Sequence, residues 1–208
     1  EQMEPYGSGN PRPVFYMEDL LLEDVTAIGG RKHLRLSLGK GSRSFSCVLF
    51  SCTPEALCVA EGDRVDAAFY PKINEFRGRR SLQFLIADLR PTDIVSRCRA
   101  LLDGKSPEPW TAAEICPERV DFVTVWRWLE SNGGSAGGTA GELEKLAPAG
   151  MRPERLILCL RIMAEEGLLS LRWDGEHMDV KTLLREGKAD LEASPLWRAF
   201  RTCADKYY

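Results

Sequence analysis

Apolar side chains recur at every second position through most of residues 20–89. Leu34, Leu36 and Leu38 alternate with polar neighbours. The same spacing continues in two later groups: Phe45, Cys47 and Leu49, then Val65, Ala67 and Phe69. Successive side chains of a β-strand point to opposite faces, so this period places one face of each strand on a core. The first part of the chain is therefore predicted to fold as strands.

Turn signals divide this region into five strands and one short helix. Gly29-Gly30 and Lys40-Gly41-Ser42 predict hairpin turns. Thr53 followed by Pro54 predicts the start of a short helix that runs to about Val59. Two more strands are expected after it, near Arg64–Tyr70 and Arg80–Leu89. Three strands, a short helix and two strands is the element order of a five-stranded OB-fold barrel.

Beyond Pro117 the apolar period becomes helical. The segment Pro117–Glu130 is predicted to be a helix with one apolar stripe, formed by Val120, Val123, Trp126 and Leu129. Ser131–Gly141, rich in Gly, Ser and Ala, is expected to be a mobile loop. A short helix, a strong helix, a hairpin with an Asp-Gly turn and a last helix are expected at Gly141–Ala147, Arg152–Glu166, Leu168–Lys181 and Leu191–Phe200. Three helices followed by a hairpin is the winged-helix order.

The expected fold class is α+β, with an OB-fold β-barrel followed by a mostly helical winged-helix-like domain. A linker segment, the OB-fold domain, a linker with a short helix and the winged-helix-like domain are expected at residues 1–12, 13–92, 93–117 and 118–208. Pro-rich and Gly-rich stretches mark both linkers. The chain begins at Glu1 rather than at Met, which predicts a piece of a longer protein.

The cysteine pattern predicts a reducing compartment. None of the seven cysteines forms a C-x-x-C pair, and Cys47 and Cys159 lie in apolar runs, as small buried hydrophobes do. The longest apolar run, Leu156–Leu160, is far shorter than the roughly 20 residues of a membrane-spanning helix. No signal-peptide pattern opens the chain. A cytoplasmic location without a membrane partner is expected.

Residue types that support catalysis are sparse. The two histidines, His33 and His177, lie far apart in the sequence. No histidine accompanies the carboxylates that could hold a metal, which are Asp63, Asp66, Asp88 and Asp93. We therefore expect no catalytic residue, no metal ligand and no cofactor within these 208 residues.

Basic residues gather in two predicted loops of the barrel. An OB barrel binds single strands on its second and third strands, between the loop joining strands one and two and the loop joining strands four and five. Cations there would neutralise phosphates, and an aromatic ring would stack on a base. The candidate nucleic-acid-binding residues are Arg31, Lys32, Arg35, Lys72, Phe76, Arg77, Arg79 and Arg80. The alternative interpretation is that these are ordinary solvated charges.

The predicted helix Arg152–Glu166 is too apolar to read a DNA groove. Six of its 15 positions are Leu, Ile or Met, and Glu165 and Glu166 would repel phosphate. Residues 118–208 hold 13 Lys and Arg against 15 Asp and Glu. A core helix in a domain that contacts other proteins fits these features better.

Four segments resemble the RecJ family of bacterial single-stranded-DNA-specific exonucleases. Glu4–Phe15 is similar to the lead into the family's OB domain, and Lys32–Leu36 resembles its second barrel strand. Asn74–Gln83 resembles its fourth loop and fifth strand, and Lys188–Leu196 is similar to the C-terminal extension of clostridial-type members.

The resemblance implies a 5′-to-3′ exonuclease of the DHH phosphoesterase family that acts in DNA recombination and repair. It also implies Mn or Mg held by Asp and His residues of an N-terminal core. No segment matches the Asp-His-His motif of that core, so the chain resembles the C-terminal part of such an enzyme. Single-stranded DNA is the expected partner, and this piece alone is expected to be inactive.

Two other functions stay open. One is an interaction module that binds repair proteins, such as a single-strand-binding protein, and contacts DNA very little. The other is an independent nuclease.

Overall fold

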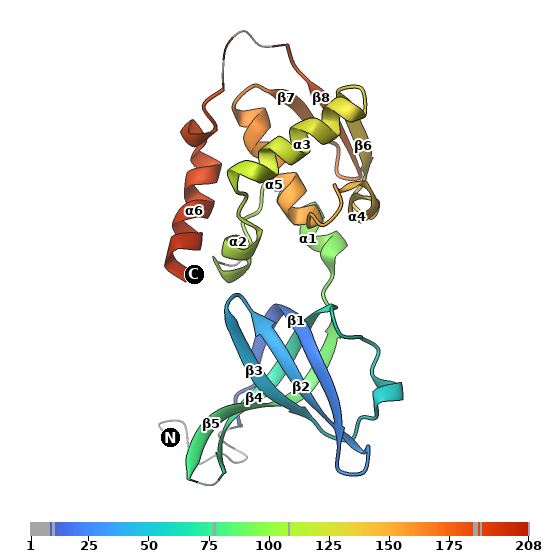
Figure 1. Ribbon diagram of the computed structural model, residues 1–208, viewed down its shortest axis with the longest axis vertical. Coiled ribbons are helices and arrows are strands. Elements are labelled where there is room, and N and C mark those ends of the chain that lie inside the picture. Colours follow the sequence, from blue (N-terminus) through green and yellow to red (C-terminus); the bar gives the residue numbers. More distant parts are fainter. Residues whose placement is uncertain are drawn as a thin grey trace. The chain divides into compact units, whose positions relative to one another are not determined.

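The computed structural model describes residues 9, 11–76, 78–107, 109–184, 187 and 189–207. The chain forms two compact units, residues 1–92 and residues 93–208, each with its own buried apolar core. Figure 1 shows that strands make up the first unit and that helices predominate in the second.

The first unit is a closed barrel in the strand order β1-β2-β3-β5-β4. The strands are β1 (Phe15–Ile28), β2 (His33–Lys40), β3 (Arg43–Leu49), β4 (Arg64–Phe76) and β5 (Arg79–Pro91). Neighbouring strands are antiparallel except β3 and β5, which are parallel. The predicted five-stranded OB-like barrel is confirmed. The last two strands are longer than predicted, and their hairpin projects from the barrel as an arm (Figure 1).

Alternating apolar residues fill the barrel. Leu36 lies opposite Cys47 across β2 and β3, Cys47 lies opposite Phe84 across β3 and β5, and all three are buried. The Phe84 ring stacks on Phe69 at 4.0 Å and on Phe45 at 5.0 Å between centroids. Since these residues point inward, the residues between them point outward.

The helix predicted from Thr53 to Val59 is wrong in extent. Only a 3-10 turn, η1 (Pro54–Ala56), forms, and the Thr53 side chain makes no capping hydrogen bond to it. Leu57 is extended, with φ −75° and ψ 118°. Leu57 and Val59 both pack against the barrel core, and their two-residue spacing suits an extended segment. This packing outweighs the tendency of so short a segment to form a helix.

A buried ionic cluster holds β1 where its register against β4 shifts. Asp19 is fully buried and has a φ of 56°. Its carboxylate oxygens each lie 3.8 Å from a cation, one from Lys40 Nζ and the other from Arg64 Nε. The Asp19 backbone N–H donates to Asp66 Oδ1 at 3.0 Å. Charges paired in this way can stay buried at an irregular point of the strand.

The second unit contains six α-helices and a small sheet among its described residues. The elements are α1 (Ile94–Leu102), α2 (Pro109–Ile115), α3 (Arg119–Ser131), β6 (Ser135–Thr139), α4 (Leu143–Leu146), α5 (Pro153–Glu165), β7 (Leu169–Trp173), β8 (His177–Thr182), η2 (Leu191–Ala193) and α6 (Pro195–Tyr207). The sheet is antiparallel in the order β6-β8-β7. In the described part of the chain, no helix combines the length and the apolar character needed to cross a membrane.

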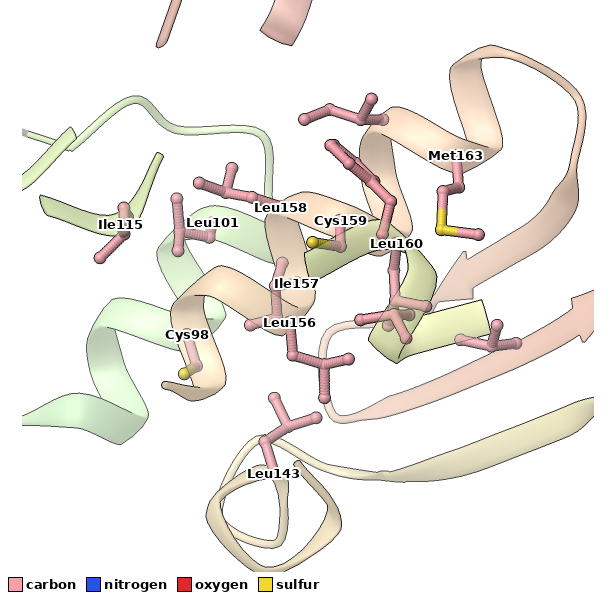
Figure 2. Close-up of a cluster of buried hydrophobic side chains, with 14 of the residues drawn as sticks. Cys98, Leu101, Ile115, Leu143, Leu156, Ile157, Leu158, Cys159, Leu160 and Met163 are labelled. Atoms are coloured by element: carbon pink, nitrogen blue, oxygen red, sulfur yellow. The ribbon is translucent and has the colours of Figure 1, made fainter. Parts of the chain in front are cut away.

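Helix α5 forms the centre of this unit. Every residue from Leu156 to Leu160 is completely buried, as predicted for a core helix. Figure 2 shows their side chains beside Cys98 and Leu101 of α1 and Leu143 of α4. A helix that is apolar on nearly all sides needs such cover from every direction.

The predicted mobile loop Ser131–Gly141 contains a strand. In β6, Ala136 pairs with Val180 and Gly138 with Met178 of β8. A Cβ atom on Gly138 would lie 2.5 Å from Leu146 Cδ1 of α4, so glycine allows the strand to approach that helix. The glycines that indicate a loop in the sequence thus serve close packing.

The predicted apolar stripe of α3 is wrong at two of its four positions, whereas Leu129 is buried as predicted and Trp126 packs against the core. Val120 and Val123 are 63% and 48% exposed, respectively. The helix instead buries Phe122 and Val125. Both sets fit a helical period, and the large Phe122 ring determines the choice by packing edge-on against Trp197 at 4.9 Å.

Residues 93–117 form two helices of the second unit and are more than a linker. Helix α1 is the short helix expected in this segment, and it buries Cys98 and Leu101. The proline that indicated a linker, Pro109, begins α2, and Ile115 of α2 is fully buried. Proline suits the first turn of a helix, where its missing N–H has no partner to lose.

Candidate nucleic-acid interface

Two rows of outward-pointing side chains run across the strands of the barrel. We call this outward surface the outer face. The first row, taken across β1, β2, β3, β5 and β4, is Thr26, Arg35, Val48, Leu85 and Tyr70. The second row in the same strand order is Asp24, Ser37, Ser46, Gln83 and Lys72. Inward-pointing residues such as Leu36 and Cys47 alternate with them, so the rows lie on the outward side of the strands, where Val48 alone among the ten is buried.

Two predicted cations, Arg35 and Lys72, lie on this outer face. Both are exposed, and no ion pair or hydrogen bond within the described residues engages either side chain. Strands β3 and β5 lie between their strands, so the path along the sheet from β2 to β4 is about 14 Å at the usual strand spacing. The pair can therefore contact two separate phosphates of one strand of nucleic acid.

Arg31 is engaged by an acid. It lies in the β1–β2 turn with a φ of 66°, and its guanidinium donates to Glu55 Oε1. Backbone hydrogen bonding and then this contact lower the pKa of Glu55. The neighbouring Lys32 is exposed, and no ion pair of the described residues includes it. Of these two turn cations, Lys32 is the better placed for a phosphate.

The basic residues of the β4–β5 arm are divided between its two sides. Lys72 of β4 pairs with Gln83 of β5. Arg80 of β5 pairs with Glu75, which follows Lys72 by three residues along β4. Because side chains alternate along a strand, Arg80 lies on the side of the arm opposite to Lys72. Arg77 lies outside the described residues, as do the side chains of Phe76 and Arg79.

The two predicted loops lie at opposite ends of the outer face. Ser46 pairs with Gln83 and Leu49 with Ile86, so β3 and β5 run in the same direction. In register, the β1–β2 turn is next to the end of β3, and the arm tip precedes the residues of β5 that pair with the beginning of β3. A bound strand would have to cross the face to reach both loops.

Phe50 is an exposed aromatic residue that the sequence analysis missed. It follows β3 directly, is 54% exposed, and contacts the His33 ring edge-on at 5.1 Å. The His33 ring is fixed because its Nδ1 accepts a hydrogen bond from the Ser51 backbone N–H at 3.0 Å. An exposed ring held at the edge of the outer face can stack on a base.

A carboxylate of β1, that of Glu23, extends to β2 and β3 on the outer face. Glu23 Oε2 accepts hydrogen bonds from Ser37 Oγ at 2.9 Å and from Ser44 Oγ at 2.6 Å. These bonds connect β1, β2 and β3 across their outward side. The sequence gives no sign of this group, because it depends on a bulge in β1.

Carboxylates that could have held a metal have structural partners. Asp63 Oδ2 accepts from the Ala60 N–H, and Asp66 accepts from Tyr16 and Thr92. Asp93 caps α1, and its pKa is lowered by hydrogen bonds from the backbone and then the side chain of Ser96. Among the residues that the structure describes, no group of three or more His, Cys, Asp or Glu side chains could hold a metal ion.

The cysteines are free thiols, and Cys47, Cys98 and Cys159 are buried as the sequence predicts. Burial raises the pKa of Cys47 and of Cys98 to about 12. A thiol with so high a pKa is protonated at neutral pH and is a poor nucleophile. Cys58, in contrast, is exposed.

In the second unit, a cavity of about 770 Å³ opens between α2, α5 and α6. Arg155, Trp197 and Arg201 are among its lining residues. The Arg201 guanidinium lies over the Trp197 ring at 5.6 Å, and the indole N–H donates to the Pro117 carbonyl at 2.9 Å. This cavity is concave, charged and open to solvent.

The comparisons with known proteins concern the barrel. Residues 1–88 match the family model described as the RecJ OB domain. The single-stranded-DNA-specific exonuclease RecJ of Bacillus subtilis is 31% identical over 87 residues. This match covers 41% of the present chain and 11% of the B. subtilis protein. The chain therefore corresponds to a small part of that relative's length.

Two solved structures have a similar segment. The crystal structure of RecJ in complex with Mg²⁺ from Thermus thermophilus is 26% identical, with a TM-score of 0.34, over 43% of this chain and 13% of that one. The second single-stranded DNA binding protein of Mycobacterium smegmatis is 15% identical, with a TM-score of 0.34, over 41% and 89%. The family model and the B. subtilis sequence agree: residues 1–88 of this chain are similar to the RecJ OB domain, and their described part forms an OB-like barrel.

Proposed function

We propose that the outer face binds single-stranded DNA and guides it within a longer RecJ-like 5′-to-3′ exonuclease of DNA repair and recombination. The observation that carries this proposal is that a RecJ-type OB domain presents two exposed cations, Arg35 and Lys72, on its outer surface, where no ion pair of the described residues engages either side chain. The B. subtilis relative bears the name of a single-stranded-DNA-specific exonuclease. Phosphates would contact Lys32, Arg35 and Lys72, and a base would stack on Phe50.

The dependence of affinity on salt tests this assignment. Three phosphate contacts give a plot of log affinity against log salt with a slope of about −2 for a single strand. Arg35→Ala combined with Lys72→Ala should make the slope shallower by about 1.4. Arg127→Ala combined with Arg172→Ala removes two exposed arginines of the second unit and should leave the slope unchanged. An unchanged slope in the first double variant would contradict the proposal.

For residues 118–208 we infer a winged-helix-like arrangement. The order α3, β6, α4, α5, β7 and β8, with β6 paired to β8, is that of a winged helix. The third helix of such a domain reads DNA, but here α5 is covered on nearly all sides. A protein partner, such as a single-strand-binding protein or another repair protein, suits this unit better.

A protein-interaction module is therefore the second candidate function, and the cavity beside Arg201 favours it. Binding of a single-strand-binding protein that is lost with Arg201→Glu and kept with Arg35→Ala would support it. Equal binding by both variants would count against the cavity as the contact.

In this proposal the nuclease chemistry, with Mn or Mg, belongs to a DHH core outside these 208 residues, and the protein acts in the cytoplasm. Since the described residues offer no metal-binding group, we assign no step of that chemistry to this chain. Labelled single strands incubated with the chain and Mn²⁺ should stay intact. Cleavage would show an independent nuclease instead.

A further inference from the structure

The Glu23 carboxylate is held in a fixed position on the outer face. Glu23 is the extra residue of a bulge, since Leu22 pairs with Leu38 whereas Asp24 pairs with Ser37. Its Oε2 accepts from two hydroxyls, those of Ser37 and Ser44. Two donors on one oxygen prevent the side chain from turning away from the sheet.

Gly39 provides the space that this carboxylate occupies. A Cβ atom at Gly39 would lie 2.3 Å from Glu23 Oε1, so any larger residue would displace the carboxylate. Glu23 is exposed, and no donor among the described residues is bonded to Oε1. The structure thus presents one acceptor oxygen to solvent at a defined place.

This acceptor lies beside Ser37, two residues along β2 from Arg35. A carboxylate repels a phosphate, so the sugar-phosphate backbone of a bound strand would avoid Glu23 and turn its bases toward it. An ionised carboxylate accepts hydrogen bonds but cannot donate them. Cytosine and adenine offer exocyclic amino groups, and guanine offers two adjacent N–H donors. Thymine offers only an N–H flanked by two carbonyl oxygens that the carboxylate repels.

We propose that Glu23, positioned by Ser37, Ser44 and Gly39, is a base-contacting residue that favours bases with an amino group over thymine. The inference rests on the proposed binding of single-stranded DNA to the outer face. It adds a base preference to a surface whose cations are indifferent to sequence.

The test is the affinity of the whole chain for labelled oligo(dC) and oligo(dT) of equal length. The chain should bind oligo(dC) about three- to tenfold more tightly, as expected for one exposed hydrogen bond to a charged group. Glu23→Gln can both donate and accept, so its ratio of affinities should fall to about one through tighter binding of oligo(dT). Gly39→Ala keeps the charge and displaces the carboxylate, and its ratio should fall as well.

Asp24→Asn is the matched control. It removes the same charge from the next residue, whose carboxylate is bonded to Thr26 Oγ1 at 2.8 Å. It should strengthen binding to both oligonucleotides equally and preserve their ratio. If the original chain and Glu23→Gln have the same ratio of affinity for oligo(dC) to affinity for oligo(dT), the base contact is overturned. The proposed binding of DNA to the outer face would still stand. Failure to bind either oligonucleotide would overturn the proposed function together with the base contact.

Discussion

The Asp66 carboxylate joins three strands of the barrel. It accepts hydrogen bonds from Tyr16 at 3.0 Å and Thr92 at 2.8 Å as well as from the Asp19 backbone, and Arg90 Nε lies 3.6 Å away. Its loss would leave the buried Asp19 N–H and the partly buried Thr92 hydroxyl without this acceptor.

We therefore expect Asp66→Asn to lower the free energy of unfolding by about 2–3 kcal/mol, measured by urea denaturation. Asp88→Asn, at an exposed position of the same sheet, should change it by less than about 0.5 kcal/mol. Similar losses in the two variants would show that the buried cluster does not hold the barrel closed.

Phe50 gives a second prediction at this scale. Phe50→Ala should weaken binding to a single strand by about 1–2 kcal/mol through loss of stacking. Its salt slope should equal that of the original chain, because no charge is removed. Val123→Ala, which trims an exposed apolar residue of α3, serves as the control and should bind normally. Unchanged affinity in Phe50→Ala would exclude this ring from the interface.

At the scale of elements, helix α1 begins at the N-cap residue Asp93, and the negative charge of this residue contributes to the stability of the fold. Asp93 Oδ1 accepts from the Ser96 N–H at 2.9 Å and Oδ2 from its hydroxyl at 2.8 Å, which lowers the pKa of Asp93 in the folded protein. The stabilisation is thus complete above the pKa of the unfolded chain, about 3.9, and is lost as the pH falls through the lower folded value.

Asp93→Ala should therefore cost about 1 kcal/mol of unfolding free energy at pH 7, and this cost should shrink as the pH falls below about 4. Asp93→Asn keeps a capping acceptor and should cost only a few tenths of a kcal/mol. A cost for Asp93→Ala that does not change with pH would contradict a charged cap.

Elements with a regular period could be predicted from the sequence, and those that depend on partners could not. Alternation in the first unit and the apolar run around Leu158 predict the barrel and α5 correctly. Strand β6 was missed because its glycines matter only when α4 packs against it. The stripe of α3 was misplaced because Val120 and Phe122 both fit a helical period, and only the position of Trp197 decides between them.

The candidate site shows the same limit. Arg35 could be predicted to face outward, since it stands between the buried residues Leu34 and Leu36 of a regular strand. The pairing of Arg31 with Glu55 could not, because it joins a turn to η1. Phe50 was missed because the run Val48–Phe50 resembles core sequence, although only its last residue is largely exposed.

At the scale of the whole molecule, the chain contains two separate cores. We expect residues 1–92 and residues 93–208, produced separately, each to unfold in one cooperative transition by circular dichroism. Asp66→Asn should lower the transition of the first fragment to the same extent as that of the barrel in the whole chain. A fragment that shows no transition would mean that its fold depends on the other unit.

The net charge of −3 is a poor guide to the function of the whole chain. It averages an outer face carrying Arg35 and Lys72 with a second unit in which acids outnumber bases. Local placement on the strands, and not the overall charge, is what a nucleic acid would encounter.

The most direct test of the central claim is an NMR titration of the isotope-labelled chain with a short single strand. Amide signals of the outer face, at Ser37, Ser46, Phe50 and Gln83, should shift progressively, while those of residues 93–208 should stay in place. Shifts confined to residues 93–208, or to the opposite side of the β4–β5 arm at Arg80, would contradict the assignment of the outer face as the DNA-binding surface.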